Sequence, residues 1–423
     1  MFETVTLPNG VRIVMEPMPF VRSVTFGIWV ANGSRHENMD NNGISHFIEH
    51  MLFKGTEKRS AKDIAEELDA VGGQLNAFTT KEYTCYYARV LDTHFGLALD
   101  VLSDMFFNSK FDDAEIRKEA NVILEEISMY EDTPEELVHD LTQYQVFRKD
   151  SLGYPILGTA ETITKFTNST FKNYCRDNYC PNNTIISVAG NIEPAHIVKQ
   201  VEKYFSLFEK SECLTRSFSA QYEPSITMRE KDIEQMHVCL TFPGIPSGNG
   251  ELYPLAIMNA ILGGGMSSRL FQSLREERGI VYSVYSCGTS YSDTGIFSVY
   301  AALNPSNGRE AVRLMMEGIN SIKADRITEI CLRNTKEQLK SGLLLGLESS
   351  SSRMHVIGKS MVTLNRVIEV DEQIRKVDAV TLDDIDKVFD QVFDFSKMSI
   401  TAIGKIEKSK INFEEFVKYG KTV

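Results

Sequence analysis

Two segments of this chain, about half its length apart, carry nearly the same pattern. Residues 184–193 read TIISVAGNIE and residues 398–407 read MSITAIGKIE, each a strand-like run of β-branched residues that ends in a glycine turn. The offset is 214 residues in a chain of 423. Solenoid repeats have periods of about 20–50 residues, so this spacing indicates the duplication of a whole domain.

The rest of the chain fits two similar halves. Strand-like stretches at 24–30 and 237–242 open the halves, and each is followed by a loop and then a helical pattern. We therefore predict an α+β fold of two homologous α/β-sandwich domains, each an antiparallel-rich sheet packed with helices. The polar segment KSECLTRSFSAQYEP ends in proline and predicts a linker at 210–224. The domains are then 1–209 and 225–423.

Composition excludes several classes of protein. The formal net charge is −13, from 45 Lys and Arg against 58 Asp and Glu, and this argues against a nucleic-acid binder. No apolar run approaches the ~18 residues of a membrane span. The first twenty residues lack the pattern of a signal or transit peptide. Seven scattered cysteines predict free, reduced thiols. We expect a soluble, cytoplasmic protein.

Local signals in the first half predict several helices and one hairpin. Ser60 and Asp63 have capping-box spacing, and Thr133 with Pro134 marks another helix start. The pattern predicts helices over 92–107 and 112–130, and a strand or hairpin over 74–90.

The stretch His46-Phe47-Ile48-Glu49-His50 carries the strongest chemical signal. On a helix, His46, Glu49 and His50 fall on one face. Two imidazoles one turn apart can hold a single Zn²⁺, and the glutamate between them faces the same point. The alternative is a solvated helix face with two incidental histidines.

A third zinc ligand is expected from the acidic helix at 112–130. Glu119 and Glu126 flank its apolar stripe on one side, whereas Glu125 lies on the opposite face, towards water. Glu126 is the better ligand and Glu119 a partner for a ligating histidine. The alternative is that these carboxylates are surface charges with partners along the helix.

With these motifs the sequence resembles the inverzincin metallopeptidases of pitrilysin type, whose signature is H-x-x-E-H followed about 76 residues later by a glutamate ligand. Glu126 stands 76 positions after His50. The resemblance runs along the whole chain, through LPNGVRIV, GISHFIEHMLFKGT, LNAFTTKEYTCYYA, LGYPILGT and GGGMSSRLFQSLREERGIVYSVYS. Length and repeat are similar to the short, two-domain branch related to the mitochondrial processing peptidase, which works as two chains closed into a clamshell.

This resemblance implies a zinc endopeptidase with one Zn²⁺ per chain, held by His46, His50 and Glu126 in the N-terminal domain. Glu49 is then the general base that takes a proton from the attacking water. The substrate is an extended, unfolded peptide or presequence-like segment inside the clamshell chamber. It pairs with the strand Leu75, Asn76, Ala77 and Phe78.

The resemblance also implies a role for the second half of the chain. Residues 254–266 contain no His, Asp or Glu, which is similar to the inactive C-terminal domain of the family. Its Arg275 and Tyr282 are implied to bind substrate and stabilise the oxyanion. We expect a homodimer in which these two residues reach the partner's zinc site.

One further interpretation of the function stays open. The chain could be a catalytically silent or partner-dependent subunit that acts as a scaffold or peptide-binding protein.

The run Gly263-Gly264-Gly265 lacks a phosphate-loop ending and predicts a turn. The remaining histidines are expected to be structural or surface residues, namely His36, His94, His139, His196, His237 and His355.

Overall fold

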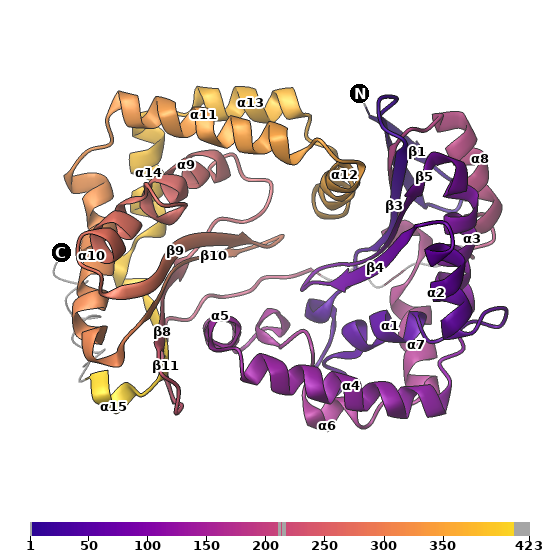
Figure 1. Cartoon of the computed structure of the whole chain (residues 1–423), viewed down its shortest axis with the longest axis horizontal. Coiled ribbons are helices and arrows are strands. Elements are labelled where there is room, and N and C mark those ends of the chain that lie inside the picture. Colours follow the sequence, from indigo (N-terminus) through magenta and orange to yellow (C-terminus); the bar gives the residue numbers. More distant parts are fainter. Residues whose placement is uncertain (1, 210–212, 214–216, 410–423) are drawn as a thin grey trace. The chain divides into compact units, whose positions relative to one another are not determined.

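The computed structural model describes residues 2–209, 213 and 217–409 (Figure 1). The described residues form two compact units. The first unit is drawn from Met1–Ser128, Tyr154–Ser217 and Leu344–Ile368. The second is drawn from Met129–Gly153, Phe218–Leu343 and Glu369–Val423. Each unit therefore takes segments from both halves of the sequence.

The first unit is built on one sheet and the helices that cover it. Its strands are β1 (Glu3–Thr6), β2 (Arg12–Pro17), β3 (Ser23–Val30), β4 (Gln74–Thr79), β5 (Thr84–Leu91) and β6 (Thr184–Gly190). Its helices are α1 (Ile44–Leu52), α2 (Ala61–Asp69), α3 (Phe95–Asn108), α4 (Asp113–Glu131), α6 (Ala160–Ile163), α7 (Asn168–Asn178), α8 (Pro194–Phe205) and α12 (Ser350–Leu364). The last turn of α4 belongs to the second unit.

The second unit has the same kind of construction. Its strands are β7 (Ile226–Glu230), β8 (Met236–Pro243), β9 (Val281–Ser290), β10 (Gly295–Leu303) and β11 (Ser399–Gly404). Its helices are α5 (Pro134–Val146), α9 (Leu252–Gly263), α10 (Gly308–Ala324), α11 (Glu329–Gly346), α13 (Val370–Ala379), α14 (Leu382–Val392) and α15 (Ile406–Ser409). The last turn of α11 belongs to the first unit.

The second sheet repeats the strand order of the first without a counterpart of β1, which confirms the predicted fold class. The first has the strand order β1-β2-β6-β3-β5-β4 and the second has the order β7-β11-β8-β10-β9. In each sheet one pair is parallel, β2 with β6 and β7 with β11, and the other pairs are antiparallel. The repeated sequence segments form the equivalent strands β6 and β11.

The glycines that end β6 and β11 have a common structural cause. Gly190 and Gly404 have φ of 143° and 133°, which side chains rarely adopt. A Cβ at Gly190 would lie 2.2 Å from the carbonyl oxygen of Ser23, and one at Gly404 would lie 3.0 Å from the carbonyl oxygen of Gln235. Both strands therefore need glycine where they pass the neighbouring strand.

Each sheet is covered on its second face by a helix from the other half of the sequence. In the first unit, α1, α3 and α8 contribute to the core on one face, and α12 packs against β2, β3 and β6 on the other. In the second unit α5 packs against β8 and β11. The division into 1–209, 210–224 and 225–423 stays a prediction about sequence order. Within that linker, 210–212 and 214–216 lie outside the described residues.

The cysteines depart from the expectation of seven free thiols. Cys180 and Cys213 form a disulfide, whereas the five other cysteines are free. The fold brings the two together because α8 returns the chain toward the start of β6. Asn9 Nδ2 donates to the carbonyl oxygens of Phe205, the last residue of α8, and of Phe208 just after it. The next residue, Gly10, lies against Asn182 before β6. Among the described residues, no helix has the length and apolar character needed to cross a bilayer.

Candidate metal centre

The helix α1 carries the H-x-x-E-H motif, and a buried carboxylate fixes its first turn. Glu37 accepts hydrogen bonds from the backbone N–H of Gly43 at 2.7 Å and of Ser45 at 2.8 Å, and from Asn42 Nδ2 at 2.9 Å. A carboxylate at a helix N-terminus satisfies free N–H groups there and favours the helix dipole. Glu37 is only 3% exposed, and burial raises its pKa to about 7. Glu37 was absent from the sequence prediction because no local motif marks it.

His46, His50 and Glu126 lie together, as their spacing predicted. One ligand atom from each falls within 4.8 Å of the others. The distance to Glu126 Oε2 is 3.7 Å from His46 Nε2 and 3.7 Å from His50 Nε2. The two histidines come from successive turns of α1, and Glu126 comes from α4. That these atoms hold zinc stays a prediction.

Burial shifts the pKa of two members of this trio. Burial, and then the nearby His50, lower the pKa of His46 to about 3, so its ring is neutral. Burial raises the pKa of Glu126. His46 Nδ1 is buried and has no hydrogen-bond partner among the described residues. Two imidazole nitrogens and one carboxylate oxygen form a donor set that suits Zn²⁺ with a position left for water. The residues present therefore fit the metal that the motif implies.

Glu119 lies where the sequence placed it, beside a histidine of the motif. His50 Nδ1 is 2.8 Å from Glu119 Oε1, and Lys54 Nζ is 2.7 Å from Glu119 Oε2. Burial works to raise the pKa of Glu119, but hydrogen bonds from His50 and Lys54 hold that pKa below its usual value. With Nδ1–H donating to Glu119, the Nε2 lone pair of His50 is directed at Glu126.

Glu49 is half-buried next to the edge of the sheet. Thr79 Oγ1, at the end of β4, donates to Glu49 Oε2 at 2.5 Å. Burial raises the pKa of Glu49, while the hydrogen bond from Thr79 and the charge of His50 oppose that rise. A carboxylate of raised pKa in such a place is suited to accept and return a proton.

The strand predicted to bind substrate is an edge strand. β4 carries Leu75, Asn76, Ala77 and Phe78, and it is the last strand of its sheet, paired with β5 alone among the described strands. Beside it lies a hollow of about 710 Å³ between the end of α1, α2 and β4. The hollow is lined by the apolar residues Phe53, Ile64, Leu68 and Leu75, by Lys54 and Asp69, and by the strand residues Gln74, Asn76 and Tyr87.

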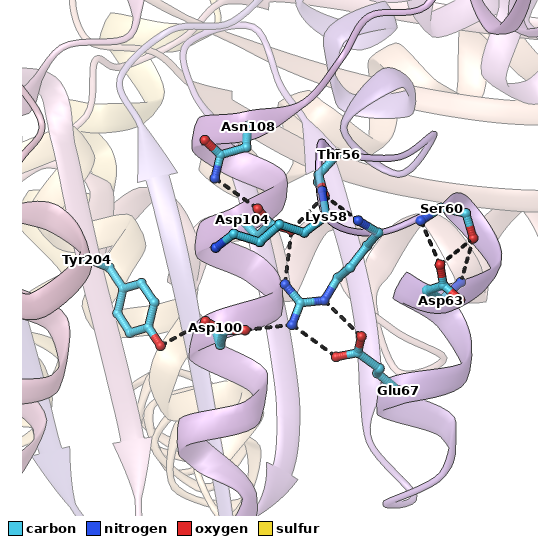
Figure 2. A network of polar contacts seen from close by, with 10 residues as sticks. Thr56, Lys58, Ser60, Asp63, Glu67, Asp100, Asp104, Asn108 and Tyr204 are labelled. Atoms are coloured by element: carbon cyan, nitrogen blue, oxygen red, sulfur yellow. Dashed lines mark hydrogen bonds and ion pairs between the residues drawn. The ribbon is translucent and has the colours of Figure 1, made fainter.

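A network around Arg59 holds the chain that leaves α1. Its guanidinium contacts Glu67 on α2 and both Asp100 and Asp104 on α3, at distances of 2.6–3.1 Å. Thr56 Oγ1 also donates to Asp104 at 2.6 Å. Figure 2 shows the carboxylates converging from the two helices. One arginine thus fixes α2, a wall of the hollow, to α3.

Arg275 and Tyr282 lie in the second unit, and they lie together. Arg275 is in the π-helical segment Phe271–Glu276, and its Nη1 donates to the carbonyl oxygen of Tyr282. Its guanidinium also lies 5.6 Å from the centre of the Tyr282 ring. Tyr282 is 67% exposed, so its hydroxyl is open to a ligand. Their action on a partner's zinc site stays a prediction.

The part of the chain that the structure describes holds one group of three or more His, Cys, Asp or Glu residues close enough to share a metal ion, namely the His46 trio. In the second unit the helix equivalent to α1 is α9, which contains none of these residue types. The run at Gly263 to Gly265 ends this helix rather than forming a phosphate loop.

Comparison with known proteins gives matches along most of the chain. The family model for insulinase (peptidase family M16) matches residues 12–160, and the model for the peptidase M16 inactive domain matches residues 165–339. The uncharacterized zinc protease YmxG of Bacillus subtilis is 47% identical over 93% of this chain and 96% of the relative. An uncharacterized zinc protease of Streptomyces coelicolor is 40% identical over 95% and 89%.

Solved structures share the fold at low identity. A protease from Helicobacter pylori aligns with a TM-score of 0.89 at 20% identity, over 96% of this chain and 99% of that chain. A peptidase M16 inactive domain from Pseudomonas fluorescens aligns with a TM-score of 0.89 at 18% identity, over 95% and 98%. Taken with the family models and the close relatives, these matches show that the chain belongs to peptidase family M16.

Proposed function

We propose that this protein is a zinc-dependent endopeptidase that cleaves extended, unfolded peptides or presequence-like segments. The observation that carries the proposal is the position of Glu49. It lies between two histidines that share a metal-binding geometry with Glu126, and it is hydrogen-bonded to Thr79 at the end of an edge strand. Base, ligand trio and peptide-binding edge are thus joined within one unit.

His46, His50 and Glu126 would hold the metal. Zinc supplies Lewis acidity, which makes water a stronger acid and polarises a carbonyl oxygen. Glu49 accepts the proton of the attacking water as the new C–O bond forms, and returns it to the amide nitrogen as the C–N bond breaks. Glu119 keeps His50 in the correct tautomer, with its Nε2 directed at Glu126.

The substrate is bound by strand addition. The free edge of β4 offers backbone N–H and C=O groups to an extended peptide, so folded proteins that cannot supply a free strand are excluded. The hollow beside β4 has room for a substrate side chain. The net charge of −13 favours basic peptides.

The active form in this proposal is a homodimer. Arg275 and Tyr282 of one chain bind substrate at the other chain's zinc site, where the Tyr282 hydroxyl stabilises the oxyanion. Their mutual contact and the exposure of Tyr282 support this role. The proposed compartment is the cytoplasm; the five free cysteines agree with a reducing compartment, whereas the Cys180–Cys213 disulfide does not.

The test compares wild type with Glu49→Gln on a long, unstructured, basic fluorogenic peptide, with zinc content measured on the same samples. Glu125→Gln is the matched control, because Glu125 is exposed on α4. We expect equal zinc in all three proteins and cleavage by wild type and the control, with turnover by Glu49→Gln reduced by roughly 100-fold or more. Equal cleavage by Glu49→Gln, or no cleavage by zinc-loaded wild type, would contradict the proposal.

A further inference from the structure

We propose that His355 on α12, together with Phe78 and Tyr87, forms an aromatic recognition surface that selects an aromatic side chain of the bound peptide. This inference rests on the proposed function, because it takes the peptide to pair with β4. It assigns a role in specificity to a residue from the second half of the sequence.

Close packing of α12 sets the position of His355. Met354, Ile357 and Met361 of this helix are buried against the sheet. A Cβ at Gly358 would lie 2.3 Å from the Trp29 indole, so only glycine permits this approach. His355 flanks the buried stripe of α12. The helix therefore holds the imidazole at a fixed height over the sheet.

The imidazole is part of an ordered cluster of rings. It stacks on Phe78 with centroids 5.7 Å apart and an interplanar angle of 26°, and it meets Tyr87 edge-on at 4.8 Å. Trp29 closes the cluster at 6.0 Å from His355. His355 Nδ1 lies 2.8 Å from the carbonyl oxygen of Ser351, which holds the plane of the ring. These geometries are favourable for aromatic pairs.

The surface lies on a face of the sheet that a bound strand would extend. Side chains alternate along β4: Leu75 and Ala77 pack into the core on the α1 face, so Asn76 and Phe78 lie on the α12 face. A peptide paired with β4 places every second side chain on this same face. Asn76 is exposed, while Phe78, Tyr87 and His355 are each half-buried. None of these three residues is fully buried in the described structure.

Nearby charged residues determine which kind of peptide side chain this surface favours. Arg89 follows Tyr87 by two residues on β5 and therefore points to the same face, and Lys359 lies one turn beyond His355 on α12. Both are exposed. Two positive charges beside the rings disfavour lysine and arginine of the peptide. An aromatic side chain gains ring contacts without that repulsion.

The experiment measures peptide binding in the Glu49→Gln protein, so that no peptide is consumed. Labelled unstructured peptides carry one phenylalanine, moved stepwise along an otherwise fixed sequence, with alanine as the reference residue. His355→Ala, His355→Phe and Ser360→Ala are compared in this background. Ser360 is the control, because it lies on the opposite flank of the buried stripe of α12.

We expect phenylalanine at alternate positions to tighten binding roughly two- to tenfold over alanine. His355→Ala reduces the ratio of phenylalanine-peptide to alanine-peptide affinity to about one, whereas His355→Phe and Ser360→Ala keep the preference. Equal weakening of all peptides by His355→Ala, or an undiminished preference, overturns the inference and leaves the peptidase proposal standing. Aromatic-selective binding without cleavage by wild type overturns the peptidase proposal alone. No binding of any peptide overturns both.

Discussion

Glu119 is the residue through which the acidic helix controls the imidazole of His50. Its contact with His50 Nδ1 fixes the tautomer, and its contact with Lys54 keeps it ionised. Glu119→Gln removes the charge, so we expect zinc affinity to fall roughly 10- to 100-fold. The measurement is competition for zinc with a chelator, with Glu125→Gln on the same helix as control. Equal affinity in the two variants would contradict this role.

Glu37 predicts a pH dependence of stability. Its pKa is about 7 in the folded protein and near 4.5 when unfolded, so the folded state holds the extra proton between these values. The contribution of Glu37 is therefore present below pH ~4.5 and is lost as the pH rises to about 7. Relative to Glu37→Gln, the free energy of unfolding of wild type should fall over this window. Denaturant unfolding at several pH values measures it, and a parallel pH profile for the two proteins would count against the assignment.

The residues that carry chemistry differ in how visible they are in sequence. His46, Glu49 and His50 share one helical face, and helical phase separates Glu126 from Glu125, so local periodicity was enough to group them. Glu37 and His355 had no such signal. Glu37 reaches α1 across a loop, and His355 reaches β4 from a helix some 270 residues further along the chain. Only tertiary structure creates those contacts.

At the scale of elements, the close contact of α12 with its sheet gives a matched pair of glycine variants. Gly358→Ala places a Cβ against Trp29 and should destabilise the protein by about 1–3 kcal/mol. Gly342→Ala, in α11, meets no atom within 4 Å and should stabilise by about 0.5–1 kcal/mol through helix propensity. Denaturant or thermal unfolding of both variants measures this. Unchanged or increased stability of Gly358→Ala would contradict the packing constraint at that position.

Local sequence signals predicted the helices and strands well. They did not predict which sheet each helix packs against. The Ser60 capping box opens α2, Pro134 opens α5, and the predicted hairpin is β4 with β5. The placement of α5 and α12 on sheets of the opposite half was not predicted. An amphipathic pattern shows that a helix face is buried, but it does not show which of two similar sheets covers it.

At the scale of the whole molecule, duplication produced two units of like topology, of which one keeps the zinc motif. The proposed homodimer predicts complementation between two inactive variants. In a mixed dimer of Glu49→Gln and Arg275→Ala chains, one site regains both residues. Random mixing should restore about one quarter of wild-type activity, since half the dimers are mixed and each has one intact site. Peptide cleavage after mixing and re-equilibration measures it. No recovery in dimers shown to exchange subunits would indicate that Arg275 does not act across the dimer.

The duplication itself was readable from residues 184–193 and 398–407, because strands β6 and β11 need the same glycine at the same place. The Cys180–Cys213 disulfide was not readable, because it depends on α8 returning the chain to the start of β6.

The central claim is that His46, His50 and Glu126 form one zinc site per chain. Anomalous scattering at the zinc edge, from crystals of protein purified with zinc, tests it most directly. We expect a single peak per chain, about 2.0–2.2 Å from a nitrogen of each histidine and from a carboxylate oxygen of Glu126. A zinc peak elsewhere, or no peak among these three side chains at saturating zinc, would contradict it.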